Sequence, residues 1–122
     1  MFANYDYSNF PEVNVLFNGE PNNNYDFQLF LDQWLQLYKD KREFTFIFNM
    51  KDISYANPIY CYKLANFISK LKQRDIQYLQ STTFINMNLL MNKLLEFIFF
   101  IQTPVSRVII KYNDGYTKEI YP

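Results

Sequence analysis

The stretch FTFIFNMKDISYANPIYCYKLANFISKL, residues 44–71, decides the fold that we predict for this chain. Its first part, residues 44–50, is rich in aromatic and β-branched residues and has no helical stripe. It predicts a central strand, apolar on both faces, in a sheet covered by helices. Asn57 and Pro58 form a favoured helix start, because Asn caps free N–H groups and Pro suits the first helical position. The helix that follows buries a stripe with a spacing of about 3.6 residues: Cys61, Leu64, Ala65, Ile68 and Leu71.

A first helix and an edge strand precede this unit. The segment PEVNVLFNG, residues 11–19, alternates apolar and polar side chains and ends at Asn18-Gly19, which predicts an edge strand and a turn. The helix that follows is expected to start near Asp26. Its apolar residues fall on one helical stripe: Phe27, Phe30, Leu31, Trp34, Leu37 and Tyr38.

The remaining elements continue the alternation of strand and helix. We expect a third strand at 75–81 and a third helix that is capped by Asn86 and ends at Thr103-Pro104. Two strands flanking Asn113-Asp114-Gly115 predict a C-terminal β-hairpin. The chain is therefore predicted to be a single α/β domain over residues 1–122, with residues 1–9 loosely ordered. The sandwich should contain a four- to five-stranded mixed sheet and three helices.

Composition and charge exclude several classes of function. The 122 residues are 49% hydrophobic and 20% aromatic, too apolar for a disordered chain. A net charge of zero argues against nucleic-acid binding. No apolar run reaches the roughly 18 residues that span a bilayer. We expect a soluble, intracellular, cytoplasmic protein. Its many Asn, Tyr, Phe, Ile and Lys residues, with only two Gly, suggest an AT-rich genome.

The sequence contains few residues of the kinds that catalytic sites use. The chain has no histidine and only one cysteine, which excludes His-based triads and zinc sites. Gly19 and Gly115 are too far apart for a phosphate-binding glycine loop. Asp52 could hold a metal ion or accept phosphate, but the acidic pair typical of receiver domains is missing. Cys61 fits either a small core residue or, if exposed, a reactive thiol. We predict a protein that is not an enzyme and binds no cofactor or metal.

The middle of the chain resembles a known family. The segment REFTFIFNMKDISYANPIYCYKLANFISKLKQRDIQYLQ, residues 42–80, is similar to the middle of STAS domains, the fold of bacterial anti-sigma-factor antagonists. Residues 25–50, YDFQLFLDQWLQLYKDKREFTFIFNM, also resemble the SiaC-type regulatory phosphoproteins, a STAS-like branch. The resemblance spans about residues 25–110. It implies a STAS-like α/β sandwich and a regulatory role exerted through protein–protein interaction.

The loop after the central strand departs from the STAS pattern. Residues 52–54, Asp-Ile-Ser, take the place of the family's D-h-S motif, where h is hydrophobic. The phosphoacceptor motif D-S-S-G falls on residues 57–60, where neither serine is present. The family's phosphoserine switch is therefore not carried over. We predict an exposed loop that docks a protein partner through five residues: Asp52, Ser54, Tyr55, Asn57 and Tyr60.

The third helix suggests an alternative function. In LLEFIFFI, residues 94–101, three phenylalanines lie on more than one face of the helix: Phe97, Phe99 and Phe100. A helix on a sheet buries only one side, so some of these rings must meet another surface. The alternative prediction is a structural or self-assembling protein, of viral origin for example, that forms a homodimer through the helix at 87–101. The N-terminal segment could instead cover these rings.

Overall fold

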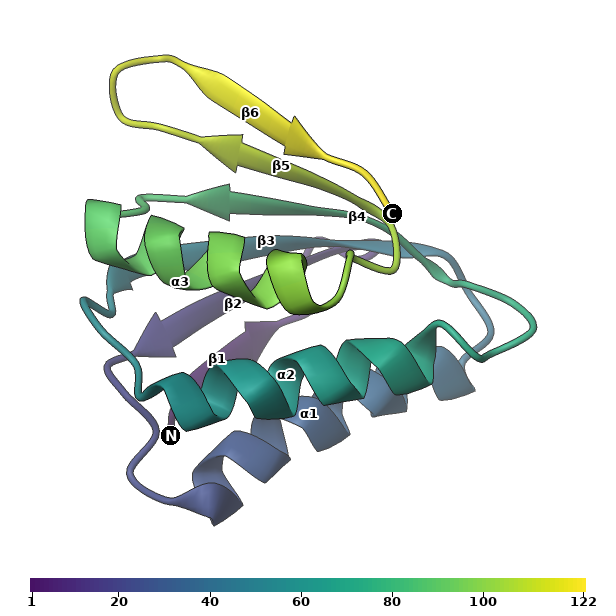
Figure 1. Ribbon diagram of the computed structural model, residues 1–122. Helices are drawn as coiled ribbons and strands as arrows, with labels where there is room; N and C mark the ends of the chain where they lie inside the picture. Colours follow the sequence, from purple (N-terminus) through teal and green to yellow (C-terminus); the bar gives the residue numbers. More distant parts are fainter.

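In the computed structural model, which describes residues 1–122, a six-stranded sheet carries all three helices on one face (Figure 1). The elements follow one another as β1 (Ala3–Asp6), β2 (Glu12–Asn18), α1 (Asn24–Lys39), β3 (Phe44–Asp52), α2 (Pro58–Leu71), β4 (Leu79–Ile85), α3 (Leu89–Ile101), β5 (Arg107–Lys111) and β6 (Thr117–Ile120). The strands lie in the sheet in chain order, β2 to β5 parallel and the two edge strands antiparallel to their neighbours.

The α/β class, the mixed sheet, the three helices and the C-terminal hairpin agree with the prediction, whereas the number of strands was wrong. The additional strand is β1, which lies within the N-terminal segment that we expected to be loosely ordered. It pairs with β2 from Ala3 opposite Phe17 to Asp6 opposite Asn14. Because β1 occupies that side of β2, β2 is an internal strand and not the edge strand that its sequence suggested.

Two boundaries also differ from the prediction. β4 covers Leu79–Ile85 and not residues 75–81, because the chain after α2 runs through an irregular connection before it joins the sheet. The cap of α3 is Asn88, whose side-chain oxygen accepts a hydrogen bond from the backbone N–H of Met91 at 2.8 Å. Asn86, the expected cap, has a left-handed backbone with φ of 60° and donates its side-chain N–H to Asn49.

The sheet is covered on one face only, which corrects the expectation of a β3 strand buried on both sides. Along β3, buried residues alternate with half-buried ones. The buried set comprises Phe44, Phe46, Phe48 and Met50, and it faces the helices; the half-buried set comprises Thr45, Ile47 and Asn49. Figure 1 shows no helix on the second face. The domain is thus a two-layer sandwich whose core lies between sheet and helices.

Aromatic rings fill this core. Phe46 is 0% exposed and lies with its ring centroid 5.2 Å from that of Trp34 on α1 and 4.7 Å from that of Phe48. Trp34 also contacts Phe67 of α2 at 5.0 Å. The two pairs that involve Trp34 are edge-to-face, an arrangement that adds to the stabilisation that burial alone provides. The ring cluster therefore connects β3 to both α1 and α2.

The N-terminal strand is fastened to the same core. The hydroxyl of Tyr5 donates a hydrogen bond to the backbone oxygen of Phe30 in α1 at 2.7 Å. Phe2 is buried and packs against Phe17 with a centroid distance of 5.2 Å. Burial, and to a smaller extent the neighbouring Tyr7, raises the pKa of Tyr5 well above its ordinary value.

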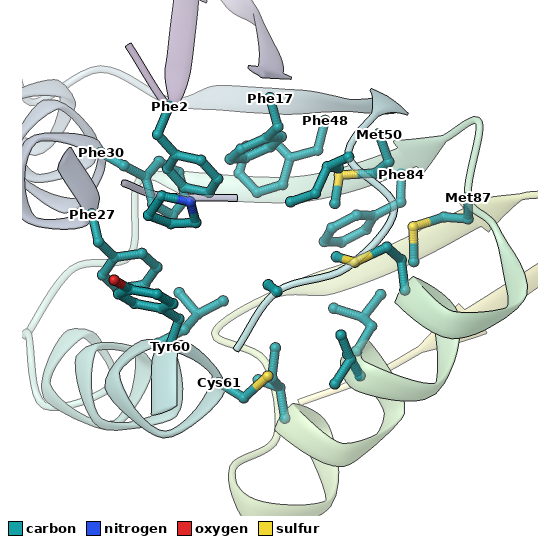
Figure 2. Close-up of a pocket in the computed structure, with 18 residues that line it drawn as sticks. Phe2, Phe17, Phe27, Phe30, Phe48, Met50, Tyr60, Cys61, Phe84 and Met87 are labelled. Atoms are coloured by element: carbon teal, nitrogen blue, oxygen red, sulfur yellow. The ribbon is translucent and has the colours of Figure 1, made fainter. Parts of the chain in front are cut away.

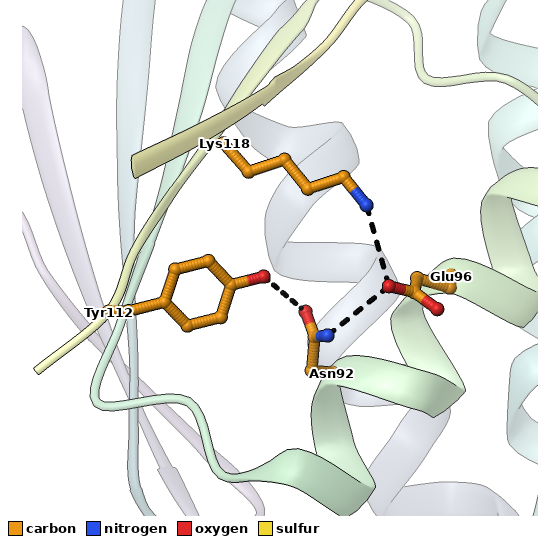
Figure 3. A network of polar contacts seen from close by, with 4 residues as sticks. All are labelled: Asn92, Glu96, Tyr112 and Lys118. Atoms are coloured by element: carbon orange, nitrogen blue, oxygen red, sulfur yellow. Dashed lines mark hydrogen bonds and ion pairs between the residues drawn. The ribbon is translucent and has the colours of Figure 1, made fainter. Parts of the chain in front are cut away.

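A polar network joins α3 to the C-terminal hairpin (Figure 3). Asn92 accepts a hydrogen bond from the hydroxyl of Tyr112 at 2.9 Å and donates one to Glu96 at 3.3 Å. Glu96 in turn pairs with Lys118 of β6 at 3.4 Å. These contacts orient the side of α3 that carries Asn92 and Glu96 toward the hairpin. None of the three helices combines the length and apolar character that a membrane crossing requires.

Candidate docking surface and apolar cavity

The β3–α2 loop, residues 53–57, lies at the carboxyl end of the parallel strands, and three hydrogen bonds hold it together with Asp52, the last residue of β3. The backbone N–H of Gly19 donates to the oxygen of Asp52 at 2.9 Å. The backbone N–H of Asn57 donates to the Glu20 carboxylate at 2.8 Å. The side chain of Asn88, the cap of α3, donates to the oxygen of Ile53 at 3.3 Å. The loop is thus tied to both of its neighbouring connections.

The five loop residues singled out by the sequence have different surroundings. Asp52, Ser54 and Tyr55 are exposed. Asn57 is exposed as well, but its side chain caps α2 by accepting a hydrogen bond from the N–H of Ile59 at 3.0 Å. Tyr60 is half-buried, with its ring centroid 4.9 Å from that of Phe27. The structure thus brings Ser54 and Tyr55 to the surface, whereas Tyr60 forms part of an internal wall.

The three phenylalanines of α3 also differ in their exposure to solvent. Phe100 is 87% exposed. Phe97 is half-buried, and the ring of Tyr62 from α2 stands edge-on to it at a centroid distance of 5.5 Å. Phe99 is half-buried and packs against the domain's own core. Of the three rings that the sequence offered for an interface, Phe100 is therefore the one that is fully presented to solvent.

Further apolar side chains of α2 and α3 are exposed in addition to Phe100. Leu89, at the first position of α3, is 81% exposed. Leu90 and Ile101 are also exposed, although their helical spacing places them next to the buried stripe. Tyr62 and Ile59 on the outer side of α2 complete the set. Periodicity identifies the apolar side of a helix, but it does not show how much of that side the neighbouring elements cover.

We call this region the α2/α3 surface and define it by seven exposed side chains: Tyr55, Ile59, Tyr62, Leu89, Leu90, Phe100 and Ile101. The chain has thirteen exposed large hydrophobic residues, and more than half of them lie on this one loop and two helices. The two helices pack directly against each other, and Figure 1 shows them side by side. Large exposed apolar patches on a folded domain commonly mark interaction sites.

An apolar cavity of about 80 Å³ lies beneath the β3–α2 loop (Figure 2). Ile53 and Ala56 of the loop contribute to its lining. The other side chains come from the ends of β2, β3 and β4, from all three helices, and from three residues outside these elements: Phe2, Pro21 and Met87. Of the eighteen lining residues, seventeen are hydrophobic. They include three methionines: Met50, Met87 and Met91.

Cys61 belongs to this lining and is buried, with 4% of its surface exposed. Burial raises the pKa of its thiol, because a thiolate would have to leave water for apolar surroundings. A reactive cysteine requires the opposite conditions, namely exposure and a lowered pKa. The environment of Cys61 therefore favours the first of the two sequence interpretations, a small core residue.

No group of three or more Cys, Asp and Glu side chains is placed so that it could hold a metal ion. No protein-family model, curated protein or solved structure matches the chain. The α/β class rests on the structure itself.

Proposed function

We propose that this protein is a non-enzymatic regulatory module that docks a protein partner through its α2/α3 surface, including the adjoining β3–α2 loop. One observation carries the proposal: seven of the thirteen exposed large hydrophobic residues lie on this loop and on two helices that pack against each other. The two interfaces suggested by the sequence, the loop at 52–60 and the helix at 87–101, thereby become parts of one surface. The STAS-like regulatory identity is part of the same proposal and rests on the sequence resemblance.

The make-up of the surface suits a protein partner. Aromatic residues are enriched at the centres of protein interfaces, where they bury a large area with few rotatable bonds. Tyr62 is held in place by its edge-on contact with Phe97, so little side-chain freedom is left for it to lose on binding. On the outer side of α3, the exposed charges Lys93 and Glu96 lie between Leu89 and Phe100 along the helix, so a partner would have to match them with polar groups of its own.

A second candidate function is self-association through the same surface. It is favoured by Phe100 and Leu89, which at 87% and 81% are the most exposed of the large hydrophobic residues. Two copies that meet through α3 would bury both residues against their counterparts, as in the two-fold dimers that are common among soluble proteins. This candidate corresponds to the homodimer predicted from the phenylalanine-rich helix.

Photo-crosslinking in cells of the source organism tests the docking proposal. A photoreactive amino acid is placed at Ile59, at Phe100 and, as a matched control, at Ile76, which is an exposed aliphatic residue outside the surface. We expect one discrete adduct with the same partner from positions 59 and 100 and none from 76. Equal adducts from all three positions, or none from any, would contradict docking at this surface.

Sedimentation of the purified protein separates the two candidates. Self-association through the surface predicts a dimer that Phe100→Glu weakens by about 30-fold, or about 2 kcal/mol, and that Ile76→Glu leaves intact. A monomer at all concentrations, together with a heterologous adduct in cells, supports the docked partner. A dimer that Phe100→Glu does not weaken would contradict self-association through α3.

A further inference from the structure

The cavity beneath the β3–α2 loop lies between the sheet and the helices, near the carboxyl ends of the parallel strands. It is not the crevice of a doubly wound fold, which forms at a topological switch point, because the strands of this sheet lie in chain order. Phe48 and Met50 come from the end of β3, and Phe84 from the end of β4. Ile53 and Ala56 belong to the loop that connects β3 to α2. This location differs from the α2/α3 surface, because the cavity lies inside the two layers.

The lining decides which chemical class can occupy the cavity. A buried water molecule needs roughly two to four polar partners, and an apolar cavity without them stays dry. The polar side-chain atoms among the lining residues are the hydroxyl of Tyr60 and the thiol of Cys61, and hydrophobic residues make up seventeen of the eighteen. A charged or hydrogen-bonding ligand would lose its hydration here without recovering it. An apolar ligand exchanges water for close contacts with the walls.

The volume restricts the size of the ligand. Engineered apolar cavities of about 150 Å³ bind benzene or xenon, and this cavity measures about 80 Å³. Three of its walls carry methionine side chains, from Met50, Met87 and Met91. Methionine is unbranched and has a polarisable sulfur, so these walls can adjust to the shape of a guest. The site therefore suits a compact molecule of a few heavy atoms.

The roof of the cavity provides a route of access. The β3–α2 loop contains no helix or strand, and it is held by three hydrogen bonds near its two ends. Of the loop residues only Ile53 and Ala56 line the cavity; Ile53 is one of the anchored residues, and Ala56 offers only a methyl group. Local opening of a connection of this kind costs far less than unfolding of the domain.

From these features we infer that the cavity beneath the β3–α2 loop is a binding site for a compact apolar molecule, a small hydrocarbon in chemical class. The inference is independent of the proposed docking function, since the two sites share the loop but not the residues that line them, and either can fail alone.

Xenon and methionine methyl signals test the site directly. The chain has four methionines, of which three line the cavity and the fourth, Met1, is 72% exposed and serves as an internal control. In protein labelled with ¹³C at the methionine methyl groups, we expect the signals of Met50, Met87 and Met91 to shift with xenon pressure and to saturate. The signal of Met1 should show only a small, linear drift. Absence of saturable shifts in the three lining methionines would overturn the inference.

Matched variants show whether the effect belongs to the cavity. Ala56→Leu extends a side chain into the cavity from the loop and should abolish the shifts, whereas Ser54→Leu adds the same side chain at an exposed position and should preserve them. Cys61→Leu fills the cavity from α2 and provides the same test if the loop variant does not fold. Saturable shifts that persist unchanged in a folded, cavity-filled variant would refute binding at this site.

Discussion

Replacement of Tyr5 by Phe tests whether the N-terminal strand is part of the folded core. The substitution removes one hydroxyl group and keeps the ring, which lies 6.3 Å from Phe30 and 6.2 Å from Phe46 between centroids. It therefore deletes the 2.7 Å hydrogen bond to the Phe30 oxygen without opening a cavity for a missing ring. A hydrogen bond of this kind contributes about 1 kcal/mol net. With about 2.1 cal/mol/K of unfolding entropy per residue, the loss should lower the Tm by about 4 °C.

The same variant makes a prediction about pH. Burial raises the pKa of Tyr5 in the folded protein above its unfolded value of about 10. The stabilisation that depends on a neutral Tyr5 is fully present below about pH 10 and is lost as the pH rises toward the raised folded pKa. Tyr5→Phe has no such group to ionise. The wild-type protein should be the more stable of the two near neutral pH, and its advantage should shrink above about pH 10.

Urea denaturation of both proteins, followed by circular dichroism across this pH range, measures the difference in the free energy of unfolding. Burial also raises the pKa of Tyr38, to about 12, but Tyr38 is present in both proteins, so its effect cancels in the difference. Equal stability at neutral pH would show that the hydroxyl contributes nothing to the packing of β1. A difference that stays constant up to strongly alkaline pH would contradict the burial of Tyr5.

Three further outcomes follow from the packing and the polar contacts. Phe46→Ala, at a fully buried ring, should lower the free energy of unfolding by about 3–5 kcal/mol in urea denaturation, and a loss below about 1 kcal/mol would show that the ring is not central to the core. Asn92→Ala removes the partner of the Tyr112 hydroxyl and should lower the free energy of unfolding by about 1 kcal/mol. It should also speed amide hydrogen exchange in the β5–β6 hairpin, and unchanged exchange there would contradict the network. Cys61, with its raised pKa, should react with a polar thiol reagent at neutral pH only at the rate of opening or unfolding; modification at the rate of a free thiol would contradict its burial.

The position of the β3–α2 loop links the two proposed sites. Its exposed residue Tyr55 belongs to the α2/α3 surface, and its residues Ile53 and Ala56 line the cavity. A substitution in the loop would therefore affect both the α2/α3 surface and the cavity. The crosslinking and xenon experiments address the two sides separately, since one reads partner contact at the surface and the other reads methyl groups inside the domain.

Local chemistry in the sequence determined much of this fold. Three features depend on residues close together in the chain, and the structure has them as expected: the strand and helix of residues 44–71, the cap at Asn57 and the hairpin at Asn113-Asp114-Gly115. The apolar stripe of α1 likewise coincides with its buried residues. Such features can be read directly because capping, turn geometry and helical spacing act over a few residues.

Contacts between distant segments decided the rest. β1 exists as a strand because β2 offers it a free edge, and nothing in residues 1–9 alone announces that pairing. Leu90 and Ile101 follow the helical pattern of core residues, yet α2 and the sheet leave them uncovered. The cavity is formed by side chains from nearly every element, so no local pattern indicates it. Whether an apolar residue becomes core, cavity wall or exposed surface depends on what packs against it, and only the tertiary structure determines that.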